Sequence, residues 1–353
     1  MTTLILGAPD PEMQEIERLA RLAGARVVYA LVGRERVHPA NAYRVDGLSE
    51  PVGDGRVAAV ECDGPAVPET AARIDHHRPG DPGHGAPPER FLPASSVGQV
   101  LRWLHDGPEQ VVPPVFSPPG TPWGAWAPAP EPCPTCGRAE CEYAVSGEIV
   151  VSREVASGWT LRGERYTGFG DERLPWALDV SACVVLAAAA DHCLAHAYAG
   201  RCPGVDPEAL MRWRVETRAA HQGRAVADVL ADVERARAML RAAPRVVEAS
   251  TLRPYLGVDV RDLRPGRGVP CAEHGPSCPG TLDGCWGDVP ELPEAAAREG
   301  IPFLARPRPR AGETAKTVLQ SAPPEAIREF LARAGEGAYG DPERGFAGVA
   351  GEL

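Results

Sequence analysis

The sequence predicts an α/β protein with a mostly parallel sheet flanked by helices, followed by a smaller C-terminal α+β domain. Short apolar runs alternate with stretches of helical periodicity in the N-terminal part of the chain, which is the pattern of a mostly parallel sheet with crossover helices. Acidic residues follow several of these runs directly, and ligands bind at the carboxyl ends of parallel strands. Beyond Arg253 the chain becomes rich in Pro and Gly, which indicates a second domain.

The apolar runs are expected to form short buried strands. They cover residues 4–7, 26–31 and 57–60, and a further short strand ends at Ile74. The first run leads into a loop that contains Asp10, and the third leads into Glu61, Cys62 and Asp63. Asp10, Asp63 and Asp75 therefore all follow predicted strands, and we expect them to converge on one edge of the sheet.

Helices are expected where apolar residues recur at helical spacing. Residues 12–23 repeat apolar side chains in this way, and residues 95–103 form a second helix with Ser95 or Ser96 as its N-cap. Residues 179–199 form an Ala-rich helix that carries Asp191, His192 and His196. Further helices are expected over residues 207–243 and 324–334.

A soft domain boundary is expected near residue 250. The larger domain, residues 1–250, carries a Pro-rich, Cys-containing insertion at about residues 107–175. Within the insertion, residues 107–132 are expected to form a surface excursion, and residues 149–155 and 159–166 to form a β-hairpin. Residues 251–353 form the smaller domain.

The composition is that of a soluble globular protein. Of 353 residues, 44% are hydrophobic and 24% are charged. The net charge of −11 argues against a broad basic surface for duplex nucleic acid, but not against a small phosphorylated ligand or a short oligonucleotide. No apolar run reaches the roughly 18 residues that a membrane span needs, and the N-terminus does not read as a signal peptide. We therefore expect a cytoplasmic protein.

The segment Asp75-His76-His77 supplies a carboxylate and two imidazoles directly after a strand. Adjacent residues in extended chain point in opposite directions, so one His can ligate a metal while the other faces a substrate phosphate. Together with Asp10 and Asp63, these residues suit one or two Mn²⁺ or Mg²⁺ ions that activate water for attack on a phosphate.

In four places the chain resembles the DHH phosphoesterase superfamily. Asp10 and Glu12 resemble the first motif, in which two acidic residues flank one position, and Asp63 resembles the single Asp of the second. Residues 74–81, which contain Asp75-His76-His77, resemble the third motif, and residues 93–99 resemble the segment with small hydroxyl side chains that follows it. The likeness covers residues 1–200.

The resemblance implies a DHH-type catalytic domain over residues 1–250 and a substrate-binding domain over residues 251–353. It implies metal ligation by Asp10, Glu12, Asp63, Asp75, His76 and Asp191. His77, assisted by Asp75, would contact the scissile phosphate or act in acid catalysis. Candidate substrate-binding residues are Ser95, Ser96, His38, Asn41, Arg344 and Gly345, although His38 and Asn41 equally suit a turn.

Two groups of cysteines have the spacing of structural metal sites. Cys133, Cys136 and Cys141 suit zinc or an iron–sulfur cluster, and Cys271, His274, Cys278 and Cys285 suit structural Zn²⁺. Ligands from both groups meeting at one site, or simply reduced and partly buried thiols, are the alternatives.

The expected function is hydrolysis of phosphoester bonds in nucleotides, short oligonucleotides or other small phosphorylated compounds. Two other interpretations stay open: a non-catalytic DHH-like protein that binds a nucleotide, and an interaction module organised by zinc. The sequence also leaves a homodimer open.

Overall fold

In the computed structural model, the described residues are 2–39, 41–105, 110–120, 156–166, 173–242, 258–259, 291–300, 303–305, 316–335 and 338–350. They form two compact units, Met1–His192 with Cys202–Asp206, and Cys193–Arg201 with Pro207–Leu353. This division lies earlier in the chain than the boundary that we expected near residue 250. The reason is that helix α7 (Val226–Ala242) packs against α8 (Leu292–Glu299) of the second unit, and α6 (Pro207–Gln222) packs against α7.

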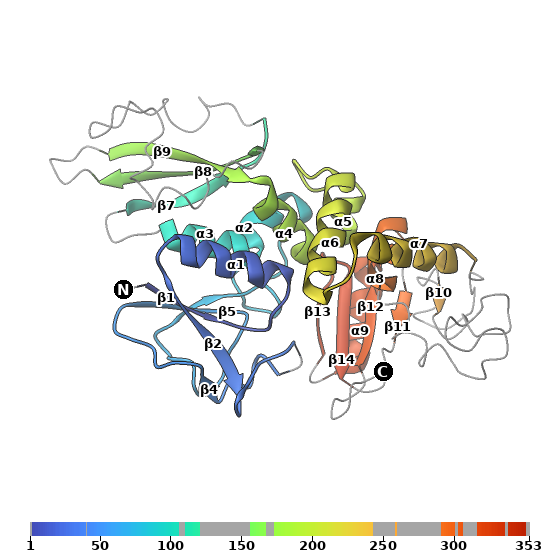
Figure 1. The fold of residues 1–353 in the computed structure, drawn as a ribbon, viewed down its shortest axis with the longest axis horizontal. Coiled ribbons are helices and arrows are strands. Elements are labelled where there is room, and N and C mark those ends of the chain that lie inside the picture. Colours follow the sequence, from blue (N-terminus) through green and yellow to red (C-terminus); the bar gives the residue numbers. More distant parts are fainter. Residues whose placement is uncertain are drawn as a thin grey trace. The chain divides into compact units, whose positions relative to one another are not determined.

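The first unit contains the predicted, mostly parallel sheet. Its four parallel strands lie in the order β2 (Arg26–Val32), β1 (Thr2–Leu6), β5 (Arg56–Val60) and β6 (Ala72–Ile74). Figure 1 labels the first three of them. Two short strands, β3 (Glu35–Arg36) and β4 (Gly47–Leu48), pair with β2 in the antiparallel sense. The α/β class and the four predicted strands are thereby confirmed.

Helix α1 (Pro11–Leu22) follows β1 at once because the sequence supplies a strong start signal. Asp10 accepts a hydrogen bond from the Met13 amide at 2.6 Å, and Pro11 occupies the first turn. The buried face, which includes Ile16 and Leu19, packs on α3 (Ser96–His105) and α4 (Ala182–His192). These contacts hold the beginning of α1 and the end of α4 in one unit.

The register of the parallel strands aligns the last residues of β1, β5 and β6. Leu6 lies beside Val60, and Val60 beside Ile74, so the residues that follow these strands emerge together at the sheet edge. Gly7 approaches the neighbouring chain so closely that an added Cβ would lie 2.5 Å from the Glu61 carbonyl oxygen. Glycine is therefore required at this edge.

The insertion contains an antiparallel sheet of β7 (Gln110–Ser117), β8 (Ala156–Tyr166) and β9 (Arg173–Ser181). The prediction of a mere surface excursion over residues 107–132 was wrong for β7. In the structure β8 pairs with β7 and β9, while residues 149–155 lie outside the described residues. The expected helix over residues 179–199 begins only at Ala182, because the preceding residues belong to β9, and it is interrupted at Cys193 before α5 (Leu194–Tyr198).

Two short helical turns connect β6 to α3 in the first unit, namely η1 (Pro88–Arg90) and α2 (Phe91–Ala94). Phe91 is fully buried, and its ring packs edge-on against Trp159 of β8. The indole N–H of Trp159 donates to the Pro203 carbonyl. The insertion is thereby joined to the core of its unit.

The second unit combines helices with a mixed sheet, as expected for an α+β domain. The sheet order is β10 (Val258–Asp259), β11 (Phe303–Ala305), β12 (Lys316–Gln320), β14 (Phe346–Ala350) and β13 (Tyr339–Asp341). Helix α9 (Pro324–Ala334) buries Ile327 and Phe330 in a core with Leu319 of β12. The helices predicted over residues 207–243 and 324–334 are confirmed.

Among the described residues, no helix is both long and apolar enough to cross a membrane.

Candidate metal centre

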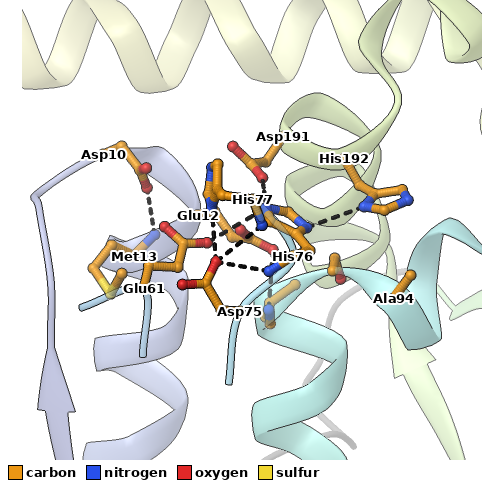
Figure 2. A network of polar contacts seen from close by, with 12 residues as sticks. Asp10, Glu12, Met13, Glu61, Asp75, His76, His77, Ala94, Asp191 and His192 are labelled. Atoms are coloured by element: carbon orange, nitrogen blue, oxygen red, sulfur yellow. Dashed lines mark hydrogen bonds and ion pairs between the residues drawn. The ribbon is translucent and has the colours of Figure 1, made fainter. Parts of the chain in front are cut away.

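Carboxylate and imidazole side chains gather at the carboxyl ends of β1, β5 and β6 and at the end of α4 (Figure 2). The members of this acidic cluster are Asp10, Glu12, Glu61, Asp75, His76, His77 and Asp191. All belong to the first unit. Four separate segments thus contribute to one site.

Four of these residues form a group that could hold a metal ion. One ligand atom each from Glu61, His76, His77 and Asp191 lies within 4.8 Å of all the others. Two carboxylates and two imidazoles are donors that suit Mn²⁺, Zn²⁺ or Fe²⁺ better than Ca²⁺.

Glu61 occupies the position directly after β5, with a left-handed backbone (φ 49°) that is uncommon for a residue other than Gly. Its amide donates to the Ile74 carbonyl at 2.9 Å, which extends the parallel pairing by one residue. The side chain is buried. Burial raises the pKa of Glu61 to about 8; His77 opposes this shift, and Asp191 and Asp10 add to it by repulsion.

Glu12 and Asp10 extend the cluster from the first turn of α1. Glu12 Oε1 accepts a hydrogen bond from the Val97 amide at 3.0 Å, at the N-terminal end of α3. Burial and the charge of Asp191 hold the pKa of Glu12 well above its usual range. The same two causes raise the pKa of Asp10 to about 6, although the Met13 amide favours its ionised form.

Burial and mutual repulsion outweigh the charge of His77 at these carboxyl groups, since the pKa values of Glu61 and Asp10 are raised in spite of it. Glu12 Oε2 and Glu61 Oε1 are buried and accept no hydrogen bond from any described residue. An unpaired buried carboxylate is costly, whereas a bound cation would stabilise several at once. The residues present therefore fit a divalent metal ion.

Asp75 lies beside this donor group rather than in it. Its Oδ1 accepts from the amides of His76 and His77 and lies 2.9 Å from His77 Nδ1. Its Oδ2 accepts from the Tyr43 hydroxyl at 2.9 Å. Burial disfavours the charged form, but the hydrogen bonds from His77 and Tyr43 together hold the pKa of Asp75 below its usual range.

His76 connects the donor group to α4 through both of its ring nitrogens. Nε2 lies 2.7 Å from Asp191 Oδ2 and 3.6 Å from Glu61 Oε1. Nδ1 lies 3.0 Å from Nδ1 of His192, the last residue of α4. Both imidazole rings are buried, so their contacts are protected from water.

No family model, curated protein or solved structure matches this chain. A functional assignment therefore depends on the acidic cluster itself.

The structure brings together most of the residues that the sequence singled out, but not Asp63. Asp63 is exposed, and its Oδ1 accepts from the amide of its neighbour Gly64. Its backbone pairs with Ala42 and Val45 of a neighbouring loop, which holds the residue outside the acidic cluster. Glu61, two residues earlier and level with the strand ends, occupies the place that we predicted for Asp63.

The proposed substrate contacts of Ser95 and Ser96 are not supported, because both residues are fully buried. The Ser95 hydroxyl donates to the Leu92 carbonyl and accepts from the Gly98 amide, which stabilises the start of α3. The side-chain oxygen of Asn41 accepts a hydrogen bond from the His38 backbone N–H at 2.8 Å. The backbone N–H of Asn41 donates in turn to the His38 carbonyl. The second alternative for these two residues, shaping a turn, is therefore the one that the contacts favour.

The remaining predicted residues lie elsewhere. Gly345 (φ 67°) and Arg344 form the turn between β13 and β14 in the second unit, where Ala322 donates to the Gly345 carbonyl. Both predicted cysteine sites fall outside the described residues, namely Cys133, Cys136, Cys141, Cys271, His274, Cys278 and Cys285.

Sequence reasoning missed Glu61, Tyr43 and His192 as parts of this site. Glu61 carried a usable signal, since it follows the β5 run directly as Asp75 follows β6. His192 stands next to a predicted ligand, but nothing in the sequence pairs it with His76, which is 116 residues away.

Proposed function

We propose that this protein is a metal-dependent hydrolase of the DHH type, which cleaves phosphoester bonds in nucleotides, short oligonucleotides or other small phosphorylated compounds. The observation that carries the proposal is the convergence of acidic and imidazole groups from four segments. Among them, Glu12 and Glu61 each have a buried carboxylate oxygen that accepts no hydrogen bond from the described residues. Mn²⁺ is the preferred ion, because the donor group mixes carboxylates with imidazoles.

Glu61, His76 and Asp191 are the residues that would hold the first ion. Asp10 and Glu12 interact electrostatically with Glu61 and Asp191, and they are the residues that would hold a second ion. A bound divalent ion supplies a water of lowered pKa and a positive charge for the phosphoryl oxygens.

His77 is assigned to the substrate rather than to the metal. Its side chain is 26% exposed, whereas that of His76 is 0% exposed. Asp75 accepts from His77 Nδ1, which fixes the tautomer and the direction of the ring. The same contact stabilises the protonated imidazole, so that His77 can give a proton to the leaving oxygen.

The decisive experiment compares the activities of variants at Glu61 and Asp63, two acidic residues that are two positions apart. Hydrolysis of bis(p-nitrophenyl) phosphate and p-nitrophenyl phosphate is measured with Mn²⁺, Mg²⁺ or Zn²⁺ for the wild type, Glu61→Gln and Asp63→Asn. We expect Glu61→Gln to lose more activity than the roughly 10–100-fold that is typical of residues behind the ligands. Asp63→Asn, the matched control, should retain wild-type activity because Asp63 is exposed and outside the cluster.

Two results would overturn the proposal. One is metal-independent hydrolysis that survives Glu61→Gln. The other is a wild-type protein that binds Mn²⁺ but cleaves neither phosphodiesters nor phosphomonoesters, including short oligonucleotides, since this would favour a binding protein.

A further inference from the structure

His192 is a buried group of the first unit that the proposed reaction leaves unused. It ends α4, directly after Asp191, and its ring lies 5.1 Å from that of His76 between centroids. Its Nδ1 is 3.0 Å from His76 Nδ1, and its Nε2 is 3.4 Å from the Ala86 carbonyl oxygen (Figure 2 shows the pair of rings). Each of its nitrogens therefore faces a polar atom.

These two contacts favour one placement of the hydrogens on the two rings. The carbonyl of Ala86 can only accept, so Nε2 of a neutral His192 carries the hydrogen and Nδ1 presents a lone pair. Nδ1 of His76 must then carry the hydrogen that lies between the two rings. This leaves Nε2 of His76, the nitrogen beside Asp191 and Glu61, as the one that can ligate.

We infer that His192 is a positioning residue that accepts the Nδ1 hydrogen of His76 and thereby presents Nε2 of His76 to the metal ion. The inference rests on the proposed metal centre and adds a role that the resemblance to known enzymes does not assign.

A histidine is a suitable acceptor at this place for an electrostatic reason. Metal-bound imidazoles commonly donate their second N–H to a carboxylate or a carbonyl. Here Glu12, Glu61 and Asp191 already repel one another, and a further carboxylate behind His76 would add to this repulsion. The neutral imidazole of His192 orients the His76 ring without adding charge. The Ala86 carbonyl in turn fixes the tautomer of His192.

Two variants separate hydrogen bonding from packing. In His192→Leu the acceptor is lost while much of the volume is retained. In His192→Asn the amide oxygen can occupy the place of Nδ1 and accept the same hydrogen. The affinity for Mn²⁺ is measured from the electron paramagnetic resonance signal of the free ion, with circular dichroism to confirm folding.

We expect His192→Leu to weaken Mn²⁺ binding by about 10–100-fold, and His192→Asn to bind within a few-fold of the wild type. In metal-free protein labelled with ¹⁵N-histidine, Nδ1 of His76 should be protonated in the wild type and in His192→Asn. The preference of the His76 hydrogen for Nδ1 should be lost in His192→Leu. A change in packing alone would not move the tautomer.

The inference is overturned if His192→Leu binds Mn²⁺ as tightly as the wild type, or if both variants weaken binding equally. It is also overturned if Nδ1 of His76 is unprotonated in the wild type. A wild type that binds Mn²⁺ without hydrolysing phosphoesters would overturn the proposed function and leave the role of His192 standing. A wild type that binds no Mn²⁺ would remove both.

Discussion

At the scale of single residues, Asp75 shows how one carboxylate can hold several neighbouring groups in place. Its two carboxylate oxygens accept hydrogen bonds from two backbone amides, from the His77 ring and from the Tyr43 hydroxyl. The Asp75 carbonyl oxygen accepts from the Gln99 side chain at 3.0 Å and from the Gly83 amide at 3.1 Å. Because every one of these contacts fixes the strand end, His76 and His77 leave it in defined and different directions.

The hydroxyl of Tyr43 should therefore contribute measurably to stability. Tyr43→Phe removes a donor from a buried, ionised acceptor, and we expect the free energy of unfolding to fall by about 1.5–3 kcal/mol. Urea unfolding at neutral pH measures this loss. The control Tyr29→Phe removes a hydroxyl that donates to the partly exposed Glu17, and it should cost less. Equal losses in the two variants would show that the Tyr43 contact is not special.

At the scale of elements, the acidic cluster depends on three parallel strands ending at one level. β1 and β5 were predictable as apolar runs, and β6 as the short strand directly before Asp75. The place of Glu61 directly after β5 favoured it over Asp63, but this pattern alone did not decide between the two residues. Which of the two residues enters the cluster depends on the left-handed turn at Glu61 and on the pairing of Asp63 with residues 42–45. Both features arise from contacts distant in sequence.

The segment before α3 shows the same limit. Ser95 and Ser96 have the composition expected of a phosphate-binding loop, yet the hydroxyl of Ser95 is used within the segment itself. A hydroxyl that caps a helix and one that binds a substrate look alike in sequence. Only the burial of the segment against α1 and α4 distinguishes them.

The strand-end carboxyl groups predict how stability changes with pH. In the folded, metal-free protein the pKa is about 8 for Glu61 and about 6 for Asp10, against ordinary values of 4.5 and 3.8. Between these limits the folded state binds more protons than the unfolded state, so the free energy of unfolding should fall as the pH rises from 4.5 to 8. Urea unfolding across this range, after treatment with a chelator, measures the slope.

Mn²⁺ should oppose this trend, since the ion binds ionised carboxylates and is displaced by protons. Glu61→Gln should reduce the slope in metal-free protein, because the pKa of Glu61 is raised further from its ordinary value than the pKa of Asp10. A metal-free protein whose stability rises over this range would contradict the assignment of buried, mutually repelling carboxyl groups.

At the scale of the whole molecule, each unit has its own core. The second unit joins α6 to α8 through a buried ionic network, in which Glu294 accepts from Tyr198 and Arg214, and Glu291 pairs with Arg218. A further apolar group between α6 and α7 includes Met211 and Val215. The network explains why these helices belong with the C-terminal part of the chain.

Removing one partner of this network should destabilise the second unit selectively. We expect Glu294→Gln to lower the free energy of unfolding by roughly 3 kcal/mol, because Arg214 and Tyr198 lose a buried charged partner. Hydrogen exchange followed by mass spectrometry should show faster exchange in α6 and α8, but not in β1 and β5. The control Glu208→Gln breaks an ion pair in which Glu208 is 70% exposed, and it should cost at most about 1 kcal/mol.

The wide spacing of Asp191 and His192 from the other cluster residues has a consequence for synthesis. A nascent chain that has been translated as far as His77 holds most of the acidic side chains, but the residues that complete the donor group and orient His76 emerge from the ribosome more than a hundred residues later. Contacts between such distant segments form late in folding. Loading with metal should therefore follow translation of the first unit, and a ribosome-bound fragment that ends before α4 should not retain the ion.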